Sequence, residues 1–232
     1  MEQKSGCLIC GEDLVYQEDY RRLECYFCKE SIQSNVACLN HHYVCDTCHA
    51  MSGVELIETY CLSSISRNPL EMATEIMHSE KIKMHGPEHH FLVPAVLIAA
   101  FCNTLQDDSK PAKLATARKR AENVLGGFCG THGTCGAAIG TGIFFSIITH
   151  STPLAKEEWS LSNQLAGKSL LTIAGHGGPR CCKRDTYLAI REAIQFLDEK
   201  TKVILESSEV YCQFSSNNKE CLMHACPFYS LA

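Results

Sequence analysis

The motif Cys-x-x-Cys occurs three times in the first fifty residues, and this repetition limits what the N-terminal segment can fold into. The first two copies, Cys7-Leu-Ile-Cys10 and Cys25-Tyr-Phe-Cys28, are about fifteen residues apart. Knuckles at this spacing can present four thiolates to one tetrahedral ion. The segment is also rich in turn residues, so it cannot bury a sufficient core without a metal. We therefore predict a zinc-ribbon-like metal-binding module over residues 1–52, in which zinc or iron joins these two pairs.

A second metal ion is predicted in the same module, because metal donors crowd its second half. The available donors are Cys38, His41, His42, Cys45, Cys48 and His49. A tetrahedral site uses four of them, so we predict Cys38, Cys45 and Cys48 with one histidine. We choose His42, although the spacing does not distinguish the three histidines. Residues 45–49 also match the attachment motif of c-type haem, which in most settings requires export.

Sixteen cysteines and eleven histidines stand in a chain that opens without a secretory signal. We therefore expect a cytoplasmic protein whose thiols are reduced and serve metal or redox chemistry. The longest apolar run, residues 91–101, is shorter than a membrane span of about 20 residues, so no membrane association is expected. A net charge of −5 and few basic residues in the N-terminal module argue against nucleic acid as a partner.

Residues 53–232 read as a mostly α-helical domain. Asn68 before Pro69 predicts a capped helix to about His78, and Pro87 predicts a helix start that leads to about Leu105. Further helices are predicted over 111–124, 133–149, 160–174 and 184–200. One strand is predicted over 202–211.

Three imidazoles and a carboxylate gather where the second of these helices begins. His85, Glu88 and His89 match the H-x-x-E-H pattern of inverted zinc peptidases, but Pro87 breaks the helical turn that this pattern needs. The alternatives are a set of acid–base groups or ligands and a helix-capping cluster.

Two further segments combine cysteine with glycine. In residues 126–142, Cys129, His132 and Cys135 precede a helix whose Gly136, Ala137 and Gly140 share one face, suited to close packing. In residues 177–184, the adjacent Cys181 and Cys182 stand at a helix start beside cationic side chains, which favour a thiolate. A phosphate or carboxylate site is the alternative there.

These patterns predict a functional metal or iron–sulfur centre in the helical domain. Its predicted sulfur donors are Cys129, Cys135, Cys181 and Cys182, with Arg180 as a further binding residue. The candidate catalytic residues are His85, Glu88, His89, His132 and Cys182. Cys212, Cys221 and Cys226 form a looser set without an assigned role.

The predicted reaction is redox chemistry, sulfur handling or thiol-linked one-carbon transfer, catalysed by an oxidoreductase or transferase on a small-molecule or protein-thiol substrate. The alternative is a non-catalytic adaptor whose zinc ribbons bind a protein or, less favourably, nucleic acid.

The chain resembles an uncharacterised family of cysteine-rich prokaryotic proteins, a domain of unknown function seen mainly in archaea and anaerobic bacteria. The segments that carry this resemblance are CLICG…CYFC at 7–28, HYVCDTCH at 42–49, MHGPEHH at 84–90, GGFCGTHGTCGAAIGTGIF at 126–144 and GGPRCCKR at 177–184. The resemblance implies an occasional association with methyltransferase-type proteins and no established reaction. The glycine–cysteine stretch is also similar to a redox family in which Gly-Cys-Ala elements precede a helix.

Overall fold

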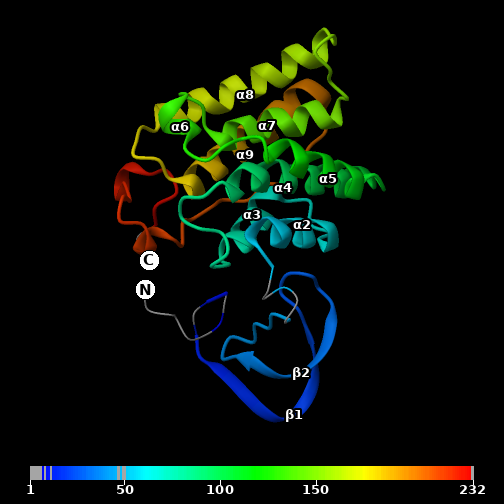
Figure 1. The fold of residues 1–232 in the computed structure, drawn as a ribbon, viewed down its shortest axis with the longest axis vertical. Coiled ribbons are helices and arrows are strands. Elements are labelled where there is room, and N and C mark those ends of the chain that lie inside the picture. The colour runs from blue at the N-terminus through cyan, green and yellow to red at the C-terminus, as the bar shows by residue number, and fades with distance from the viewer. Residues whose placement is uncertain (1–6, 8, 11, 46–47, 49–50, 231–232) are drawn as a thin grey trace.

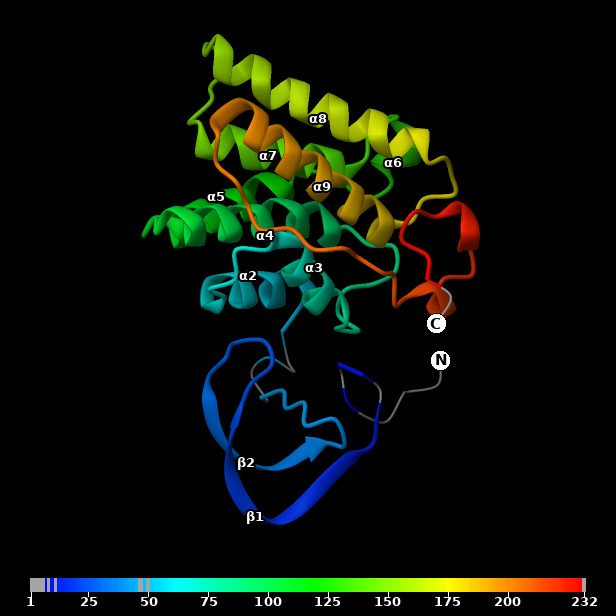
Figure 2. The ribbon, with the colours of Figure 1, turned by 180° about the vertical axis from the view of Figure 1, so that it is seen from behind.

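The computed structural model describes residues 7, 9–10, 12–45, 48 and 51–230. A small module at the N-terminus lies below a larger body of packed helices (Figure 1). The C-terminal segment returns to the end of the body where helix α9 begins, as the view from behind also shows (Figure 2). This return brings Cys212, Cys221 and Cys226 to the same cavity as Cys181, at the start of α9.

The N-terminal module is built on one antiparallel strand pair, β1 (Leu14–Glu24) and β2 (Ser31–Cys38). The register runs from Leu14 opposite Cys38 to Glu24 opposite Ser31, with an irregularity between Tyr16 and Arg21. Nearly all of β1 is exposed, so the pair buries little apolar surface. An isolated two-stranded pair is marginal in water, which agrees with a module that depends on bound metal.

Helices make up the rest of the regular structure, as the sequence predicts. Asn68 caps α3 through hydrogen bonds from the backbone N–H groups of Leu70 and Glu71, and Ser52 with Glu55 forms a capping box on α2. The helices are α2 (Gly53–Ser63), α3 (Pro69–Met77), α4 (Glu88–Leu105), α5 (Lys110–Ala121), α6 (Phe128–Thr131), α7 (Gly136–Ile148), α8 (Glu157–Gly175) and α9 (Cys182–Thr201), followed by the 3₁₀ turns η1 (Ser215–Asn217) and η2 (Met223–Ala225).

Helix α4 lies at the centre of the body and packs against α2, α3, α5, α7 and α9. It is long and apolar enough to cross a membrane, but 72% of the window that passes this test is buried inside the protein. The glycine face of α7 packs against it: a Cβ added at Gly140 would lie 2.8 Å from Cδ of Pro94. The predicted small-residue face therefore brings the backbones of α4 and α7 together.

The strand predicted over residues 202–211 is wrong, because this segment forms no β-ladder. It runs extended along the helical body (Figure 2) and is held by side chains. Leu205 is buried, and Asn68 donates a hydrogen bond to Ser208 at 2.9 Å. A β-type sequence needs a partner strand to form a sheet, and the described C-terminal residues offer only one isolated bridge, between Cys212 and Tyr229.

Candidate functional site

Eight donors of the N-terminal module form two compact groups, each able to hold a metal ion. Within each group the ligand atoms lie within 4.8 Å of one another. Metal site 1 consists of Cys7, Cys10, Cys38 and His42, and metal site 2 consists of Cys25, Cys28, Cys45 and Cys48. The sites are interleaved along the chain. The donors occur in four pairs, at positions 7 and 10, 25 and 28, 38 and 42, and 45 and 48; the first and third pairs make metal site 1, and the second and fourth make metal site 2.

The predicted donors are therefore brought together, but in a different partition. The sequence predicts Cys7 and Cys10 with Cys25 and Cys28 around one ion, and the structure separates these pairs. The reason is the strand pair: β2 returns antiparallel to β1, so Cys38 lies opposite Leu14, near the first pair. His49, one of the histidines considered for the second site, lies outside the described residues.

Distances in metal site 1 fit a tetrahedral ion. A tetrahedral ion with bonds of about 2.3 Å holds its sulfurs about 3.8 Å apart. The sulfurs of Cys10 and Cys38 are 3.8 Å apart, and Nδ1 of His42 lies 3.3 Å from the first and 3.5 Å from the second. The side chain of Asn40 donates to Cys10 at 3.6 Å, which supports a thiolate there.

Metal site 2 has the geometry of a buried four-sulfur site. The sulfurs of Cys28 and Cys45 are 3.9 Å apart, and the backbone N–H of Cys45 donates to Sγ of Cys25 at 3.4 Å. Cys25 is fully buried and Cys48 nearly so. Burial raises the pKa of Cys28 to about 11, so a bound cation is needed to keep this thiol deprotonated at neutral pH.

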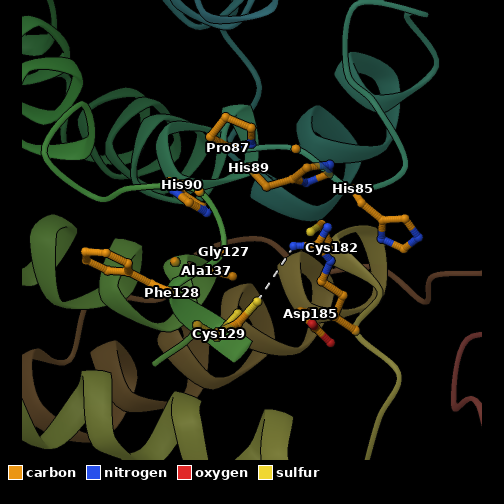
Figure 3. A pocket seen from close by; sticks show the side chains of 15 residues that line it. His85, Pro87, His89, His90, Gly127, Phe128, Cys129, Ala137, Cys182 and Asp185 are labelled. Atoms are coloured by element: carbon orange, nitrogen blue, oxygen red, sulfur yellow. Dashed lines mark hydrogen bonds between the residues drawn. The ribbon is translucent and has the colours of Figure 1, made fainter. Parts of the chain in front are cut away.

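In the helical domain, a cavity of about 280 Å³ opens between the first turns of α4, α7 and α9, and we call it the thiol cavity. Figure 3 shows that its lining comes from the three helices, from the short helix α6, which carries Phe128 and Cys129, and from the loop before α4, which carries His85. Six of the predicted site residues line it: His85, His89, Cys129, Cys135, Arg180 and Cys182.

Two thiols of this cavity stand at helix starts. Cys135 is the N-cap residue of α7, and Cys182 is the first residue of α9. Burial raises the pKa of Cys135, and it raises that of Cys182 to about 12 despite a hydrogen bond from the backbone of Gly86. Both thiols are therefore protonated at neutral pH unless a cation or a reacting sulfur takes the place of the proton.

The third thiol, Cys129, contacts the guanidinium group of Arg180. The distance from Nη1 of Arg180 to Sγ of Cys129 is 3.9 Å, drawn as the dashed line in Figure 3. The two residues come from segments fifty-one positions apart in the chain. This contact places a fixed positive charge at the cavity, where it attracts an anionic sulfur or substrate group.

His89 is held on both ring nitrogens. Nε2 lies 2.9 Å from the carbonyl of Lys83 and must donate, so Nδ1 accepts from the hydroxyl of Thr186 at 2.9 Å. Burial lowers the pKa of His89 to about 3, so the ring is neutral at physiological pH. This geometry favours a structural role over the predicted acid–base role. In contrast, Nδ1 of His85 is buried and has no hydrogen-bond partner among the described residues.

Three predicted site residues lie outside the thiol cavity. Glu88 turns back and accepts a hydrogen bond from the backbone N–H of Lys83 at 2.8 Å, which closes the loop before α4. His132 is exposed and packs on the ring of Phe128 at 4.4 Å between centroids. Cys181 lines a separate cavity, together with Cys212, Cys221 and Cys226. The predicted centre of four cysteines is therefore not assembled in the thiol cavity, because Cys181 is extended and Cys182 begins α9, so their side chains point in different directions.

Two more residues line the thiol cavity: His90, the third imidazole of the predicted cluster at the start of α4, and Asp185, which the sequence analysis missed. His90 contacts Gly136 so closely that an added Cβ there would lie 2.0 Å from its ring, and its Nδ1 lies 2.8 Å from the carbonyl of Val124. Asp185 is buried and paired with Arg184 at 2.9 Å. Burial raises the pKa of Asp185, against the lowering effect of that guanidinium. Its position three residues after Cys182, on the same side of the helix, was the available signal.

A family of unknown function, DUF5714, matches residues 57–229. The chain belongs to this family. The match confirms the resemblance to an uncharacterised cysteine-rich family. The DUF5714 region includes all the residues of the thiol cavity and begins after both N-terminal metal sites. No curated protein and no solved structure matches the chain.

Proposed function

We propose that this protein is a cytoplasmic thiol enzyme of redox or sulfur-handling chemistry, whose N-terminal module is held together by two structural zinc ions. The substrate is a small molecule or a protein thiol that enters the thiol cavity. The observation that carries this proposal is the meeting of Cys129, Cys135 and Cys182 in one cavity, from three segments of the chain.

Zinc suits both N-terminal sites. Four protein ligands close each site and leave no position for a substrate, which is typical of structural zinc. The mixed set of three sulfurs and one nitrogen in metal site 1 also favours zinc over iron, since imidazole and thiolate together are common ligands of structural zinc.

Among the predicted reaction classes, the cavity favours dithiol chemistry. A methyl-group acceptor needs one reactive thiolate, whereas reduction of a disulfide needs two thiols within reach of one another. Cys129, Cys135 and Cys182 line one cavity, so a substrate disulfide bound there can meet two of them in turn. We therefore favour sulfur exchange over one-carbon transfer.

The proposed reaction balances without a further reactant. One cavity sulfur attacks a substrate disulfide and releases the first substrate thiol, and a second cavity sulfur then displaces the other. Two S–H bonds of the protein are lost, two form on the substrate, and one S–S bond moves from the substrate to the protein. Arg180 is placed to attract an anionic group of the substrate.

A direct test uses 2-hydroxyethyl disulfide as the probe on the zinc-loaded protein under anaerobic conditions. We expect release of about two molecules of 2-mercaptoethanol per chain and, by peptide mapping, a new disulfide between two of the three cavity cysteines. Single substitutions of Cys129, Cys135 and Cys182 by serine identify the pair, because two of them should abolish the internal disulfide. Cys102→Ser, a buried cysteine elsewhere, is the matched control. If none of the three cavity variants changes the reaction, the proposed function is wrong.

The second candidate, a non-catalytic adaptor, is supported by one observation. The strand β1 is exposed along its length and presents two aromatic side chains, Tyr16 at 73% exposure and Tyr20 at 66%. Exposed aromatic groups are typical of surfaces that bind a protein partner. Under this alternative no two of the three cavity thiols would form a disulfide with each other, so the disulfide test separates the two candidates.

A further inference from the structure

A second cavity is lined by four cysteines, and we call it the C-terminal cavity. Its sulfur-bearing residues are Cys181, Cys212, Cys221 and Cys226, and apolar side chains including Tyr187, Phe214 and Phe228 form much of its wall. It lies against the start of α9, on a different side from the thiol cavity. The disulfide chemistry proposed above makes no use of it.

The C-terminal segment folds into a frame that carries three of the four cysteines. The backbone N–H of Cys212 donates to the carbonyl of Phe228 at 2.6 Å, which closes the loop between these residues. Inside the loop, the turns η1 and η2 place Cys221 and Cys226 toward the same cavity. Cys181 completes the set as the N-cap residue of α9. Cysteines from positions 181 to 226 therefore converge through the fold of the chain and not through a local motif.

The spacing of these sulfurs excludes a single tetrahedral ion in this arrangement. Such an ion needs sulfurs about 3.8 Å apart. In the part of the chain that the structure describes, only metal sites 1 and 2 bring three or more donors within 4.8 Å.

Two buried cations lie at the cavity. Arg184 is paired with Asp185 at 2.9 Å, and Lys183 donates hydrogen bonds to the carbonyls of Met77 and Ile82. One carboxylate, that of Glu220, is also part of the lining. Arg184 lines the cavity at 4% exposure, and its Nη1 is buried without a hydrogen-bond partner among the described residues. Lys183 is 3% exposed, and its ammonium lies 4.1 Å from the ring centroid of Phe214, a wall residue. Of the described carboxylates, none lies within ion-pair distance of Lys183. A buried donor without an acceptor is unfavourable, so a group that accepts a hydrogen bond from Nη1 of Arg184 is expected here.

Backbone N–H groups also point at the sulfurs. Phe214 donates to Sγ of Cys212 at 3.4 Å, and Met223 donates to Sγ of Cys221 at 3.4 Å. Hydrogen bonds of this kind stabilise thiolates that ligate iron–sulfur clusters and help to set their reduction potentials. Two of the four cysteines are thus prepared for ligation by the local backbone.

We propose that Cys181, Cys212, Cys221 and Cys226 bind a four-iron, four-sulfide cluster in the C-terminal cavity. Each thiol releases its proton to solvent as its sulfur–iron bond forms. Four thiolates around a cluster core of charge +2 give a group of net charge −2. Arg184 is already paired with Asp185, so the ammonium of Lys183 is the cation that offsets part of this charge, and the free Nη1 of Arg184 gains an acceptor. One ligand of this cluster, Cys181, directly precedes Cys182, which lines the thiol cavity. The cluster would therefore be an electron carrier beside that cavity.

The test is anaerobic purification followed by iron and acid-labile sulfide analysis, visible absorbance and electron paramagnetic resonance after reduction with dithionite. The wild-type chain should be brown and hold about four iron and four sulfide per chain, as isolated or after reconstitution with ferrous iron and sulfide. Cys212→Ala and Cys226→Ala should each reduce both contents at least about fourfold and remove the spectrum of the intact cluster.

Matched controls are Cys129→Ala and Cys135→Ala, which should keep full iron and sulfide. Zinc content and the circular dichroism spectrum report whether each variant is folded. A colourless wild-type protein after reconstitution would overturn the cluster assignment, and so would full iron content in folded Cys212→Ala and Cys226→Ala. Loss of iron in the cavity controls would move the cluster to the thiol cavity. The disulfide test is read separately, so the proposed function can fail while the cluster assignment holds, and the reverse.

Discussion

Cys181 and Cys182 are neighbours in the chain, yet their side chains line different cavities. Cys181 is extended, with φ −135° and ψ 100°, while Cys182 begins a helix, so the two side chains diverge. The sequence shows that two thiols stand at a helix start. It does not show that one of them belongs with cysteines thirty to forty-five positions further along, because that grouping depends on how the C-terminal loop closes.

His89 gives a prediction at the same scale. Its folded-state pKa of about 3 lies below its ordinary value of 6.5, so the unfolded chain binds a proton below pH 6.5 that the folded chain does not. The free energy of unfolding should therefore decrease by about 1.4 kcal/mol for each pH unit as the pH is lowered from 6.5 towards 3, through this one residue. His89→Gln removes this dependence, and it should cost about 1–3 kcal/mol at pH 7 through the hydrogen bonds to Lys83 and Thr186.

The measurement is urea unfolding of the zinc-loaded wild type and variant at pH 7 and pH 5. The difference between their free energies of unfolding should shrink by about 2 kcal/mol at the lower pH. Zinc release at acid pH affects both proteins alike and cancels in this difference. His132→Gln, at an exposed histidine, is the control and should run parallel to the wild type. A His89→Gln difference that stays constant from pH 7 to pH 5 would mean that the ring is accessible and free to titrate.

Among the elements, the helices were predictable from sequence, whereas the strand predicted over residues 202–211 does not form. Asn68-Pro69 and Pro87-Glu88 mark helix starts by local chemistry, and α3 and α4 begin at Pro69 and Glu88. A strand requires a partner that the local sequence does not specify, which is why residues 202–211 were wrongly predicted. The glycine face of α7 was also visible, since small residues at helical spacing indicate close packing whatever the partner.

Substitution of Gly136 tests the close packing of α7 against α4. A methyl group at Gly136 would lie 2.0 Å from the ring of His90, so Gly136→Ala must displace the ring or separate α7 from α4. We expect a loss of about 1–3 kcal/mol in the free energy of unfolding, and a change in the disulfide reaction of the adjacent thiol cavity. Gly167→Ala on α8 is the matched control, because a Cβ there meets nothing within 4 Å. The control should be neutral or stabilising by up to about 1 kcal/mol. Equal effects of the two substitutions on thermal stability would refute the proposed role of Gly136.

At the scale of the whole molecule, the chain combines an N-terminal module with two metal sites and a helical body with two cysteine-lined cavities. The motif Cys-x-x-Cys identified six of the eight donors of the module from sequence alone, and the crowding of further donors pointed to Cys38 and His42. The partition of these ligands was not predictable, because it follows from the register of β1 and β2, which pairs the end of one strand with the beginning of the other. Because the two sites are interleaved, a metal ion lost from either site would loosen both halves of the module.

The measurement that tests this arrangement most directly is the number of zinc ions per chain, by native mass spectrometry, in two double variants. In Cys10→Ser/Cys38→Ser both changes fall in metal site 1, so one zinc ion should remain in metal site 2. In Cys10→Ser/Cys28→Ser each site loses one ligand, and both zinc ions should be lost or greatly weakened. The reverse result, with zinc kept by the second variant and lost from the first, would show that Cys7, Cys10, Cys25 and Cys28 share one ion and would contradict the interleaved module.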